Sequence, residues 1–378
     1  MGLNRVLLCV CVLLCACNGA QEVQHIRETL DGVETYLASR PDSALTVLRN
    51  LDTGSIKLKK DQARAALLHS IALDKCYVDI TSDSILAPAL AYYRHHGTAD
   101  QRLKAHYYRA VLARNAGDRD TQMIWLVEAE RFIPRAHDPE MAGFIYAAKR
   151  QLYLDLLDVN NALIHAREAV SVYESAGLWP RYYNAVLSLA GILQMQSQYE
   201  EARRWIDTLK QHADLLTPAQ LNSLYGIQFN QEDSLGLASL PTIIDEYLNA
   251  GFSEASIRWL SVAEAYTRTG NMEQAAEAMV RYRSTAQYDT TAPIFWLVSQ
   301  RLYQASGDYE QSGYCYERYN ELMSNRRQRA IASEARFVPE RGKNHAEAIR
   351  NRLMLAGSIF HEDALASSCD SCSGVARR

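Results

Sequence analysis

Apolar residues recur at helical spacing along most of this 378-residue chain. In the first such segment, residues 23–40, the side chains of Ile26, Leu30, Val33 and Leu37 are three or four positions apart and lie on one face of a helix. Further segments of this kind follow, separated by short turns. We therefore predict eight pairs of helices, over residues 23–40 with 41–51, 60–76 with 82–96, 101–116 with 119–133, 139–156 with 160–176, 180–195 with 199–213, a helix from 218 with 236–249, 254–269 with 272–285, and 292–306 with 309–324.

The predicted pairs share a skeleton of aromatic, small and turn-forming residues that returns about every 40 residues. The clearest copies read Trp259-x2-Val262-Ala263-x2-Tyr266-x3-Gly270-Asn271-x3-Ala275 and Trp296…Tyr303-x3-Gly307-Asp308-Tyr309. Weaker copies read Ala110…Gly117-Asp118…Ala129…Pro134, Tyr146…Tyr153…Asp158…Ala162…Ala169 and Leu189-Ala190…Tyr199…Ala202. This skeleton resembles the tetratricopeptide repeat over roughly residues 60–325. The resemblance implies an all-α, tetratricopeptide-like helix-turn-helix solenoid, wound as a right-handed superhelix.

The small residues of this skeleton have a physical reason. Ala263 and Ala275 stand where two paired helices come closest, and a larger side chain there would force the helices apart. Gly270 and Gly307 follow the first helix of a pair, where a turn requires a positive φ. Because no pair can bury its apolar face alone, the pairs must stack. We place this repeat domain at residues 23–325, with the first pair as a cap.

Residues 1–16 have the features of an export signal. Arg5 is followed by an apolar stretch from Val6 to Leu14, which is too short to span a bilayer as a permanent helix. A signal of this kind is removed from the mature protein and takes no part in the fold.

Residues 14–18, with the sequence Leu-Cys-Ala-Cys-Asn, resemble the bacterial lipobox. The resemblance implies lipidation of Cys17 and cleavage after Ala16, so that residues 1–16 are a lipoprotein signal peptide and residues 17–22 are a tether. Two or three acyl chains on one residue anchor a protein firmly to a membrane. Asn18 after the cysteine favours the outer membrane of the cell envelope. The alternative is an ordinary signal peptide with incidental cysteines.

The cysteines outside this leader are too few for a disulfide scaffold. Four of the eight cysteines belong to the leader, which leaves Cys76, Cys315, Cys369 and Cys372. We interpret Cys76 and Cys315 as buried thiols on helices far apart in the stack. Cys369 and Cys372 have only His361 as a nearby imidazole, and a structural zinc site needs four ligands. We therefore predict no metal site.

Composition and motifs favour a binding protein over an enzyme. The net charge of −4 and the pI of about 6.2 exclude the basic surface that nucleic acids require. The chain has no glycine-rich phosphate loop, no Gly-x-Ser-x-Gly motif and no His-Glu-x2-His motif. The acidic pair Glu232-Asp233 has no His or Lys nearby in the sequence, and Glu200-Glu201 fits a solvated helix face. We expect neither catalysis nor a cofactor.

The chain changes in character after Asn325. Basic residues outnumber acidic ones over residues 326–357, which we predict to be a helical segment that either caps the last repeat or continues as a stalk. Residues 358–378 have no helical period and no apolar stripe, and we expect them to be disordered.

An export signal, degenerate helical repeats and a basic helical exit together resemble the extracytoplasmic sensor part of Bacteroides-type repeat-containing regulators. Proteins of that group commonly continue into a transmembrane helix. Here an apolar run begins at residues 351–357, but His361, Glu362 and Asp363 disfavour a spanning helix. The chain is then either purely extracytoplasmic or a truncated form of a longer regulator.

In tetratricopeptide-repeat proteins the first helix of each pair lines a concave groove, and ligand-facing residues recur at fixed offsets. Carrying these offsets over gives a candidate partner-binding groove of Tyr107, Arg114, Asn115, Gln151, Asn184, Gln194, Glu264, Arg268, Arg301 and Gln304. Such a groove accepts an extended peptide or a helix of a partner protein, although these polar residues could also be merely solvated.

We therefore predict a lipid-anchored envelope protein that binds a protein or peptide, as the sensory part of a signalling regulator. The alternative is a glycan-binding nutrient-uptake lipoprotein built on helical repeats.

Overall fold

The computed structural model describes residues 21–231 and 234–337, and every regular element in these ranges is helical. The α-helices are α2 (Pro41–Asn50), α3 (Lys59–Lys75), α4 (Ala87–His96), α5 (Ala99–Asn115), α6 (Arg119–Glu130), α7 (Pro139–Asp155), α8 (Val159–Ser175), α9 (Trp179–Met195), α10 (Tyr199–Gln211), α11 (Pro218–Phe229), α12 (Ser234–Leu248), α13 (Trp259–Arg268), α14 (Met272–Ser284), α15 (Pro293–Ala305) and α16 (Tyr309–Phe337). Three short 3-10 helices are η1 (Ile133–Arg135), η2 (Ala213–Leu215) and η3 (Glu254–Ser256). Residues 21–36 form a further helix before α2. The prediction of an all-α fold is confirmed.

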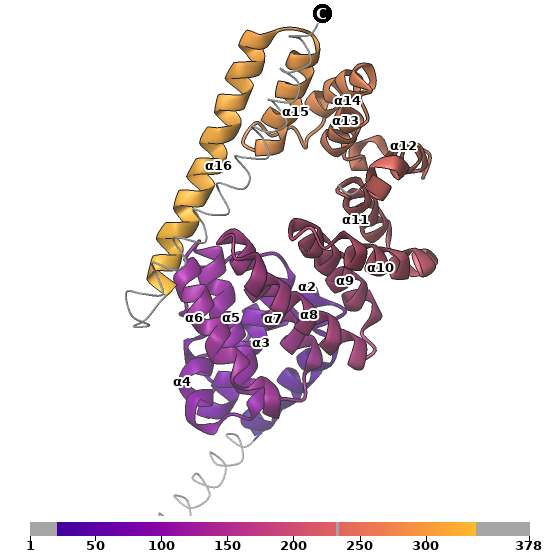
Figure 1. Ribbon diagram of the computed structural model, residues 1–378. Coiled ribbons are helices and arrows are strands. Elements are labelled where there is room, and N and C mark those ends of the chain that lie inside the picture. Colours follow the sequence, from indigo (N-terminus) through magenta and orange to yellow (C-terminus); the bar gives the residue numbers. More distant parts are fainter. Residues whose placement is uncertain (1–20, 232–233, 338–378) are drawn as a thin grey trace, which may run out of the picture.

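The helices pack in pairs in chain order, α3 with α4, α5 with α6 and so on to α15 with α16. The helix over residues 21–36 shares an apolar core with α2. The 15 helices from α2 to α16 and this first helix give the eight predicted pairs within the described ranges. Consecutive pairs follow a curved path, as Figure 1 shows from α2 through α9 to α15. None of the helices described has both the length and the apolar character needed to cross a membrane.

Small residues of the skeleton occupy the places that the repeat pattern predicts. Ala263 on α13 and Ala275 on α14 are fully buried, at 0% exposure each. Gly270 and Gly307 have φ values of 79° and 81°, in the left-handed region that an L-residue with a Cβ adopts at a cost. The predicted register of these two repeats is therefore confirmed.

Three turns of the same kind place a residue other than glycine in the left-handed conformation. Tyr77, Leu157 and Ser197 have φ values of 56°, 61° and 57°. The turn at Tyr77 closes α3 with a hydrogen bond from the backbone N–H of Val78 to the carbonyl oxygen of Leu73 (2.9 Å), as in a Schellman motif. The repeat geometry is thus kept where the sequence has no glycine, with strained backbone in its place.

Two prolines lie in the second helices of their pairs. Pro88 is in the first turn of α4, which begins at Ala87, where a proline is tolerated. Pro241 lies inside α12, which starts at Ser234 and continues through the proline.

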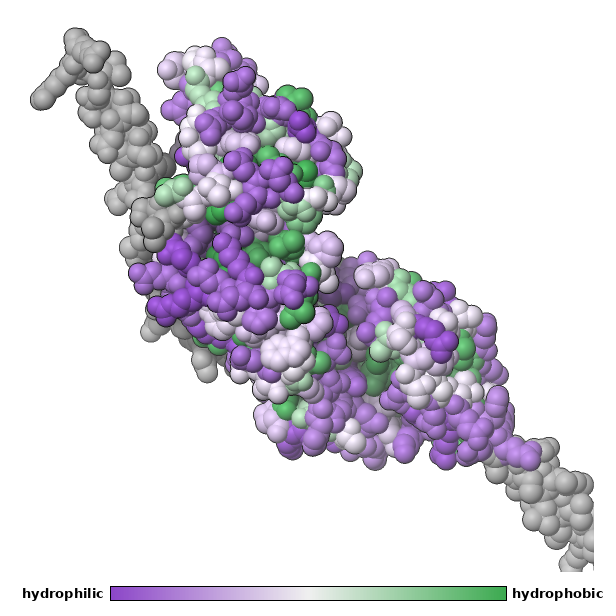
Figure 2. Space-filling model, turned by 90° about the vertical axis from the view of Figure 1, so that its right-hand side faces the viewer, coloured by the Kyte–Doolittle hydropathy of each residue, from purple (hydrophilic) through white to green (hydrophobic). Residues whose placement is uncertain are grey.

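The apolar core is divided into four clusters that follow one another along the chain. They extend over residues 26–73, 63–152, 162–224 and 229–298. A stack in which each unit packs only on its neighbours has this kind of segmented core. On the face seen in Figure 2, polar side chains cover most of the surface, with small apolar patches between them.

The last helix departs from the prediction. α16 is a single helix of 29 residues, so the boundary that the sequence placed after Asn325 is no break in the structure. α16 pairs with α15 and also contacts α6, far back in the chain. Figure 1 shows α16 crossing the open side of the curved stack. Ala330 is 2% exposed, although most of the residues around it on α16 are exposed.

Several predicted features lie outside the described residues. They are the signal peptide, Cys17 and the tether as far as residue 20, the acidic pair Glu232-Asp233, residues 338–357 of the basic segment, and the tail at 358–378 with its two cysteines. The described cysteines, Cys76 and Cys315, are free thiols. Cys315 is buried as predicted, but Cys76 is only half-buried, because it lies at the exposed C-terminal end of α3.

Candidate functional site

The first helices of three consecutive pairs, α3, α5 and α7, border a cavity of about 520 Å³, which we name the α3–α7 cavity. Apolar side chains line much of it. Leu67, Leu68 and Ile71 come from α3, Tyr108 from α5 and Phe144 from α7. The cavity is therefore built on rigid helices of the solenoid, and its apolar lining can take up apolar side chains of a ligand.

The four carboxylates that line the α3–α7 cavity already have partners within the chain. The pairs are Glu34 with Arg64, Asp138 with Lys104 (2.9 Å), Glu140 with Arg181 (3.0 Å), and Asp100 with the backbone N–H of His137 (2.6 Å). A cationic ligand would have to compete with these groups.

Two lysines of the same cavity have no acidic partner among the described residues. Both lie on α3, Lys60 in its first turn and Lys75 in its last. Fifteen positions of an α-helix separate them by about 22 Å along the helix axis. The α3–α7 cavity therefore presents two ammonium groups that have no acidic partner in the described part of the chain, with an apolar strip between them, and these can bind carboxylates of a ligand.

The predicted groove residues on α5 lie beside this cavity but do not line it. Tyr107 is half-buried, and its ring stacks on Phe144 with 6.1 Å between centroids. Burial raises the pKa of Tyr107 to about 12, so its hydroxyl stays neutral. Arg114 pairs with Asp74 of α3 at 3.1 Å. Asn115 donates a hydrogen bond to the carbonyl oxygen of Ile80, which joins its helix pair to the preceding one (3.2 Å).

The predicted residues in the middle of the chain are also engaged within the protein. Gln151 donates to Asp155 one turn further along α7 (3.2 Å). The side-chain oxygen of Asn184 accepts a hydrogen bond from Gln220 of α11 (3.1 Å). Gln194 is buried, and its amide donates to the carbonyl oxygen of Ile227 at 2.8 Å and to the side chain of Gln231 at 2.9 Å.

The predicted residues near the C-terminus form a charged cluster between repeats. Glu264 on α13 pairs with Arg301 on α15 at 3.1 Å and with Arg268 at 3.6 Å. Arg268 also donates to the carbonyl oxygens of Phe229 and Gln231 (2.6 Å for the latter). The side-chain oxygen of Gln304 accepts a hydrogen bond from Gln300.

Most of the ten predicted residues therefore tie one helix pair to the next, and none lines the α3–α7 cavity. That they contact a partner stays a prediction. The sequence analysis missed Lys60, Lys75 and Phe144. A signal for the lysines was available, because neither has an acidic residue three or four positions away within α3, and an ordinary exposed helix lysine often does.

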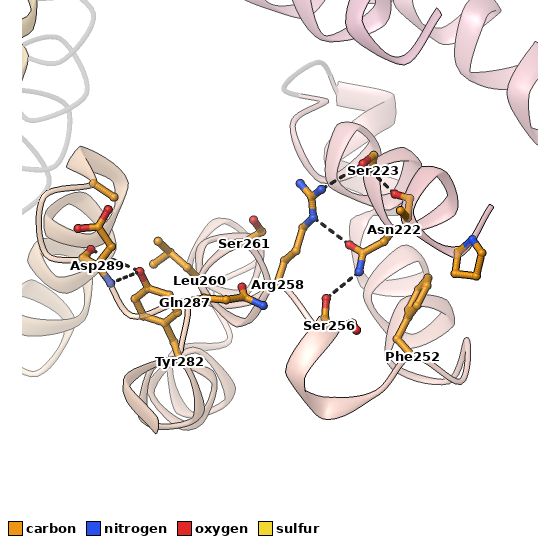
Figure 3. A pocket seen from close by; sticks show the side chains of 13 residues that line it. Asn222, Ser223, Phe252, Ser256, Arg258, Leu260, Ser261, Tyr282, Gln287 and Asp289 are labelled. Atoms are coloured by element: carbon orange, nitrogen blue, oxygen red, sulfur yellow. Dashed lines mark hydrogen bonds between the residues drawn. The ribbon is translucent and has the colours of Figure 1, made fainter. Parts of the chain in front are cut away.

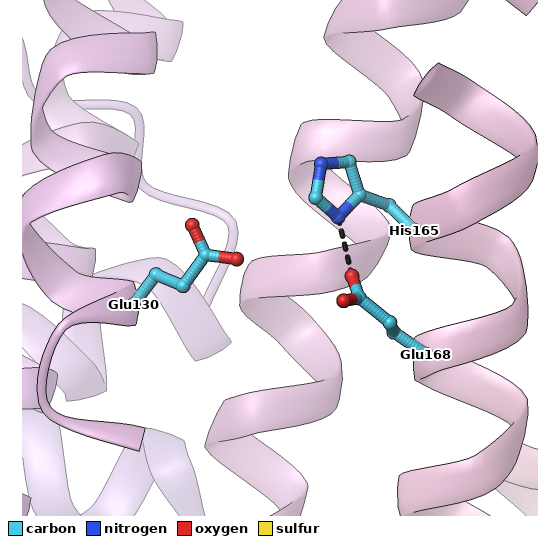
Figure 4. Close-up of side chains that lie close together, drawn as sticks. All are labelled: Glu130, His165 and Glu168. Atoms are coloured by element: carbon cyan, nitrogen blue, oxygen red, sulfur yellow. Dashed lines mark hydrogen bonds and ion pairs between the residues drawn. The ribbon is translucent and has the colours of Figure 1, made fainter. Parts of the chain in front are cut away.

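A second polar cluster joins α6, α7 and α8. His165 lies beside the rings of Tyr146 and Tyr153, and its Nδ1 is 2.6 Å from Glu168 (Figure 4). Glu130 faces this pair, and its carboxylate binds the ammonium group of buried Lys149 at 2.5 Å. Burial and the neighbouring Lys149 lower the pKa of His165. Because a metal ion here would meet the lysine on the same carboxylate, we interpret the cluster as an internal ion-pair network.

Comparison with known proteins supports the fold. No protein-family model matches the chain, and no curated protein matches it in sequence. Among the solved structures that are similar to this chain, two match over nearly their whole length. The Rap protein complexed with Competence and Sporulation Factor has a TM-score of 0.54 at 15% identity, covering 90% of this chain and 99% of Rap.

NprR in complex with its cognate peptide NprX has a TM-score of 0.51 at 14% identity, covering 88% of this chain and 99% of NprR. At such low identity the likeness concerns the fold alone. Both neighbours are helical-repeat proteins of the tetratricopeptide type. The chain has the all-α, tetratricopeptide-like helical-repeat fold.

Proposed function

We propose that this protein binds a peptide segment that carries acidic residues, and that the α3–α7 cavity receives it. The observation that carries the proposal is the pair of lysines, Lys60 and Lys75, which border an apolar lining without acidic partners among the described residues. NprR, which shares the fold, was solved with a cognate peptide, and Rap with Competence and Sporulation Factor. The proposed role is binding, without catalysis.

The lining of the cavity combines apolar side chains with charged ones, and a peptide of the same mixed character fits it. Apolar side chains of the peptide replace water against Leu67, Leu68 and Phe144. Carboxylates of the same peptide form charge-assisted hydrogen bonds with the lysines, which are about twice as strong as neutral ones. The volume of about 520 Å³ lies within the range of small-ligand sites, so the cavity holds a few residues of a longer segment.

A peptide-binding measurement tests this proposal. A library of short fluorescent peptides with acidic centres, and a matched library with neutral centres, is titrated against the protein. We expect acidic peptides to bind, and the double variant Lys60→Glu/Lys75→Glu to bind them roughly 10-fold or more weakly. The control Lys59→Glu/Lys210→Glu has the same net charge, and both of its exposed lysines lie outside the cavity. Equal binding to both double variants would contradict the proposal.

Titration with oligosaccharides beside the peptide libraries separates the two functional classes that the sequence left open. If oligosaccharides bind and no peptide does, the glycan-binding alternative is favoured and the proposal fails. The aromatic residue to examine first would then be Trp179, because its side chain is half exposed at the start of α9.

The proposal includes attachment to the cell envelope through Cys17, with the repeat domain as the sensory part of a regulator. It is supported by the lipobox-like residues 14–18. Labelling of cells with a fatty-acid probe should mark the wild-type chain and not Cys17→Ala. Fractionation should then place the labelled chain in the outer membrane. Equal labelling of both chains would contradict the lipid anchor and leave the peptide proposal standing.

A further inference from the structure

A second cavity, of about 820 Å³, lies between α11, α13 and the segment that leads into α15. We name it the Arg258 cavity. It shares no lining residue with the α3–α7 cavity. Figure 3 shows the guanidinium group of Arg258 reaching across toward α11, with Leu260, Ser261 and Gln287 along the lining between Arg258 and Tyr282.

Neutral groups hold Arg258 in this position. Its Nε donates to the side-chain oxygen of Asn222 at 2.8 Å, and its Nη2 donates to the hydroxyl of Ser223 at 3.1 Å. Its backbone N–H donates to the hydroxyl of Tyr247 at 2.9 Å, and that hydroxyl donates to Asn222 at 3.2 Å. Asn222 and Tyr247 are both buried. The network fixes the orientation of the guanidinium group without neutralising its charge.

A glycine on α11 makes room for this arrangement. A Cβ at Gly226 would lie 3.0 Å from Nη1 of Arg258, which is closer than such contacts normally are. The guanidinium group therefore lies against the backbone of α11, where any larger residue would push it aside.

The charge of Arg258 has no acidic partner among the residues described. A guanidinium group has five N–H donors, and the two side-chain hydrogen bonds engage two of them, so three take no part in these two bonds. Arg258 is exposed to the cavity. Leu260 and Ser261 in the first turn of α13 line the same cavity, and Arg258 itself is the N-cap residue of this helix.

One acidic residue, Asp289, lines the far side of the cavity and limits the choice of anion. Its carboxylate accepts hydrogen bonds from the backbone N–H and the hydroxyl of Thr291, each at 2.7 Å. These hydrogen bonds lower the pKa of Asp289, so it is charged at neutral pH. A ligand that spans the cavity and carries several negative charges would be repelled here. A single carboxylate on an otherwise neutral or cationic molecule meets no such penalty.

We propose that the Arg258 cavity is a second ligand site, which binds one carboxylate group in the fork of Arg258. Arginine and carboxylate form paired, parallel N–H···O hydrogen bonds, and a preoriented guanidinium group loses little freedom in forming them. The carboxylate can belong to the C-terminus of a peptide or to an acidic side chain within one. The shared chemistry is a monocarboxylate attached to a short, uncharged peptide segment.

Calorimetric titration of the full chain with acetylated tetrapeptide libraries tests this site. The libraries end either in a free carboxylate, in an amide, or in an amide with an internal glutamate, and inorganic phosphate is a fourth probe. We expect at least one carboxylate-bearing library to bind roughly 10-fold or more tightly than the plain amide library. The first and third libraries distinguish a C-terminal carboxylate from a side chain. Binding of phosphate alone, or equal binding of all libraries, would overturn the proposal.

Variants place the binding in this cavity. Arg258→Gln should abolish the preference for a carboxylate, and the control Arg283→Gln, which removes an exposed charge outside the cavity, should keep it. Gly226→Ala displaces the guanidinium group while leaving its charge, and should weaken carboxylate binding without lowering the melting temperature. Lys60→Glu/Lys75→Glu should leave this binding unchanged, which separates failure of this site from failure of the peptide proposal. Carboxylate selectivity that persists in Arg258→Gln would show that the site lies elsewhere.

Discussion

The ring of Tyr173 on α8 lies over Gly143 on α7, in the space where any other residue would place its Cβ. A Cβ built on Gly143 would overlap the Cε1 and Cζ atoms of that ring. Tyr173 is 4% exposed and belongs to the apolar core, so it has little room to move. The close approach of α7 to α8 therefore depends on this glycine.

We predict that Gly143→Ala lowers the free energy of unfolding by about 1–3 kcal/mol, because overpacking exceeds the gain in helix propensity. Urea denaturation measures the change. The control is Gly191→Ala on α9, where a new Cβ would meet no atom within 4 Å. Because alanine loses less backbone entropy on folding than glycine, Gly191→Ala should raise the free energy of unfolding by up to about 1 kcal/mol. If both variants are stabilised, the packing described for Tyr173 is wrong.

The turn after α3 offers a stabilising change. Tyr77 is in the left-handed conformation with φ of 56°, and its side chain is 93% exposed. Because glycine adopts this conformation without strain and little burial is lost, Tyr77→Gly should stabilise the protein by about 1 kcal/mol. Gly117, at the equivalent place one repeat later, has φ of 71°. Gly117→Ala should destabilise the protein by a similar amount. If the melting temperatures of the two variants shift in the same direction, the left-handed conformation assigned to both turn positions is wrong.

The ion pairs of Glu264 should contribute measurably to stability. The side chain of Glu264 is 13% exposed and lies between Arg268 and Arg301. Its ion pair with Arg301 joins α13 to α15. Glu264→Ala leaves Arg268, at 9% side-chain exposure, without its carboxylate, and we expect a loss of about 1–3 kcal/mol. Glu277→Ala breaks an exposed pair with Arg281 and should change stability by less than about 1 kcal/mol. Equal unfolding midpoints for the two variants would contradict this prediction.

Acid should destabilise the protein partly through His106. Its ring lies beside Trp125 and Phe132, with centroids 5.1 and 5.5 Å away, and its buried Nδ1 has no hydrogen-bond partner among the residues that the structure describes. Burial lowers the pKa of His106 below its ordinary value of 6.5, so the unfolded chain takes up the proton first. Its contribution to stability is therefore complete above pH 6.5 and is lost as the pH falls below that value.

Denaturation of wild type and His106→Leu from pH 7.5 to 5 checks this prediction. The variant should lose less stability than wild type as the pH falls. The difference between their free energies of unfolding therefore narrows or changes sign. His25→Leu, which removes an exposed histidine, is the control and should keep the slope of wild type. Parallel pH profiles for wild type and His106→Leu would rule out a role for this imidazole.

The sequence predicts the repeats well because their signals are local. Ala263 and Gly270 are required by the contact between two adjacent helices and by the turn that joins them, and both occupy the places predicted. The offsets in the repeat identify the face of the first helix, but not how much of that face the next pair covers. For this reason the sequence analysis assigned Gln194 to the groove, although it is buried against α11. It also did not single out Lys60 or Arg258.

The contact of α16 with α6 could not be read from local patterns, because it joins segments that are remote in sequence. A linear stack can unfold locally from either end, because each helix pair packs only on its neighbours. Here the last helix also rests on the first half of the chain, so fraying at the C-terminus must break two interfaces. Any bending of the middle repeats also changes the distance that α16 spans. The α16–α6 contact thus links the curvature of the solenoid to its stability.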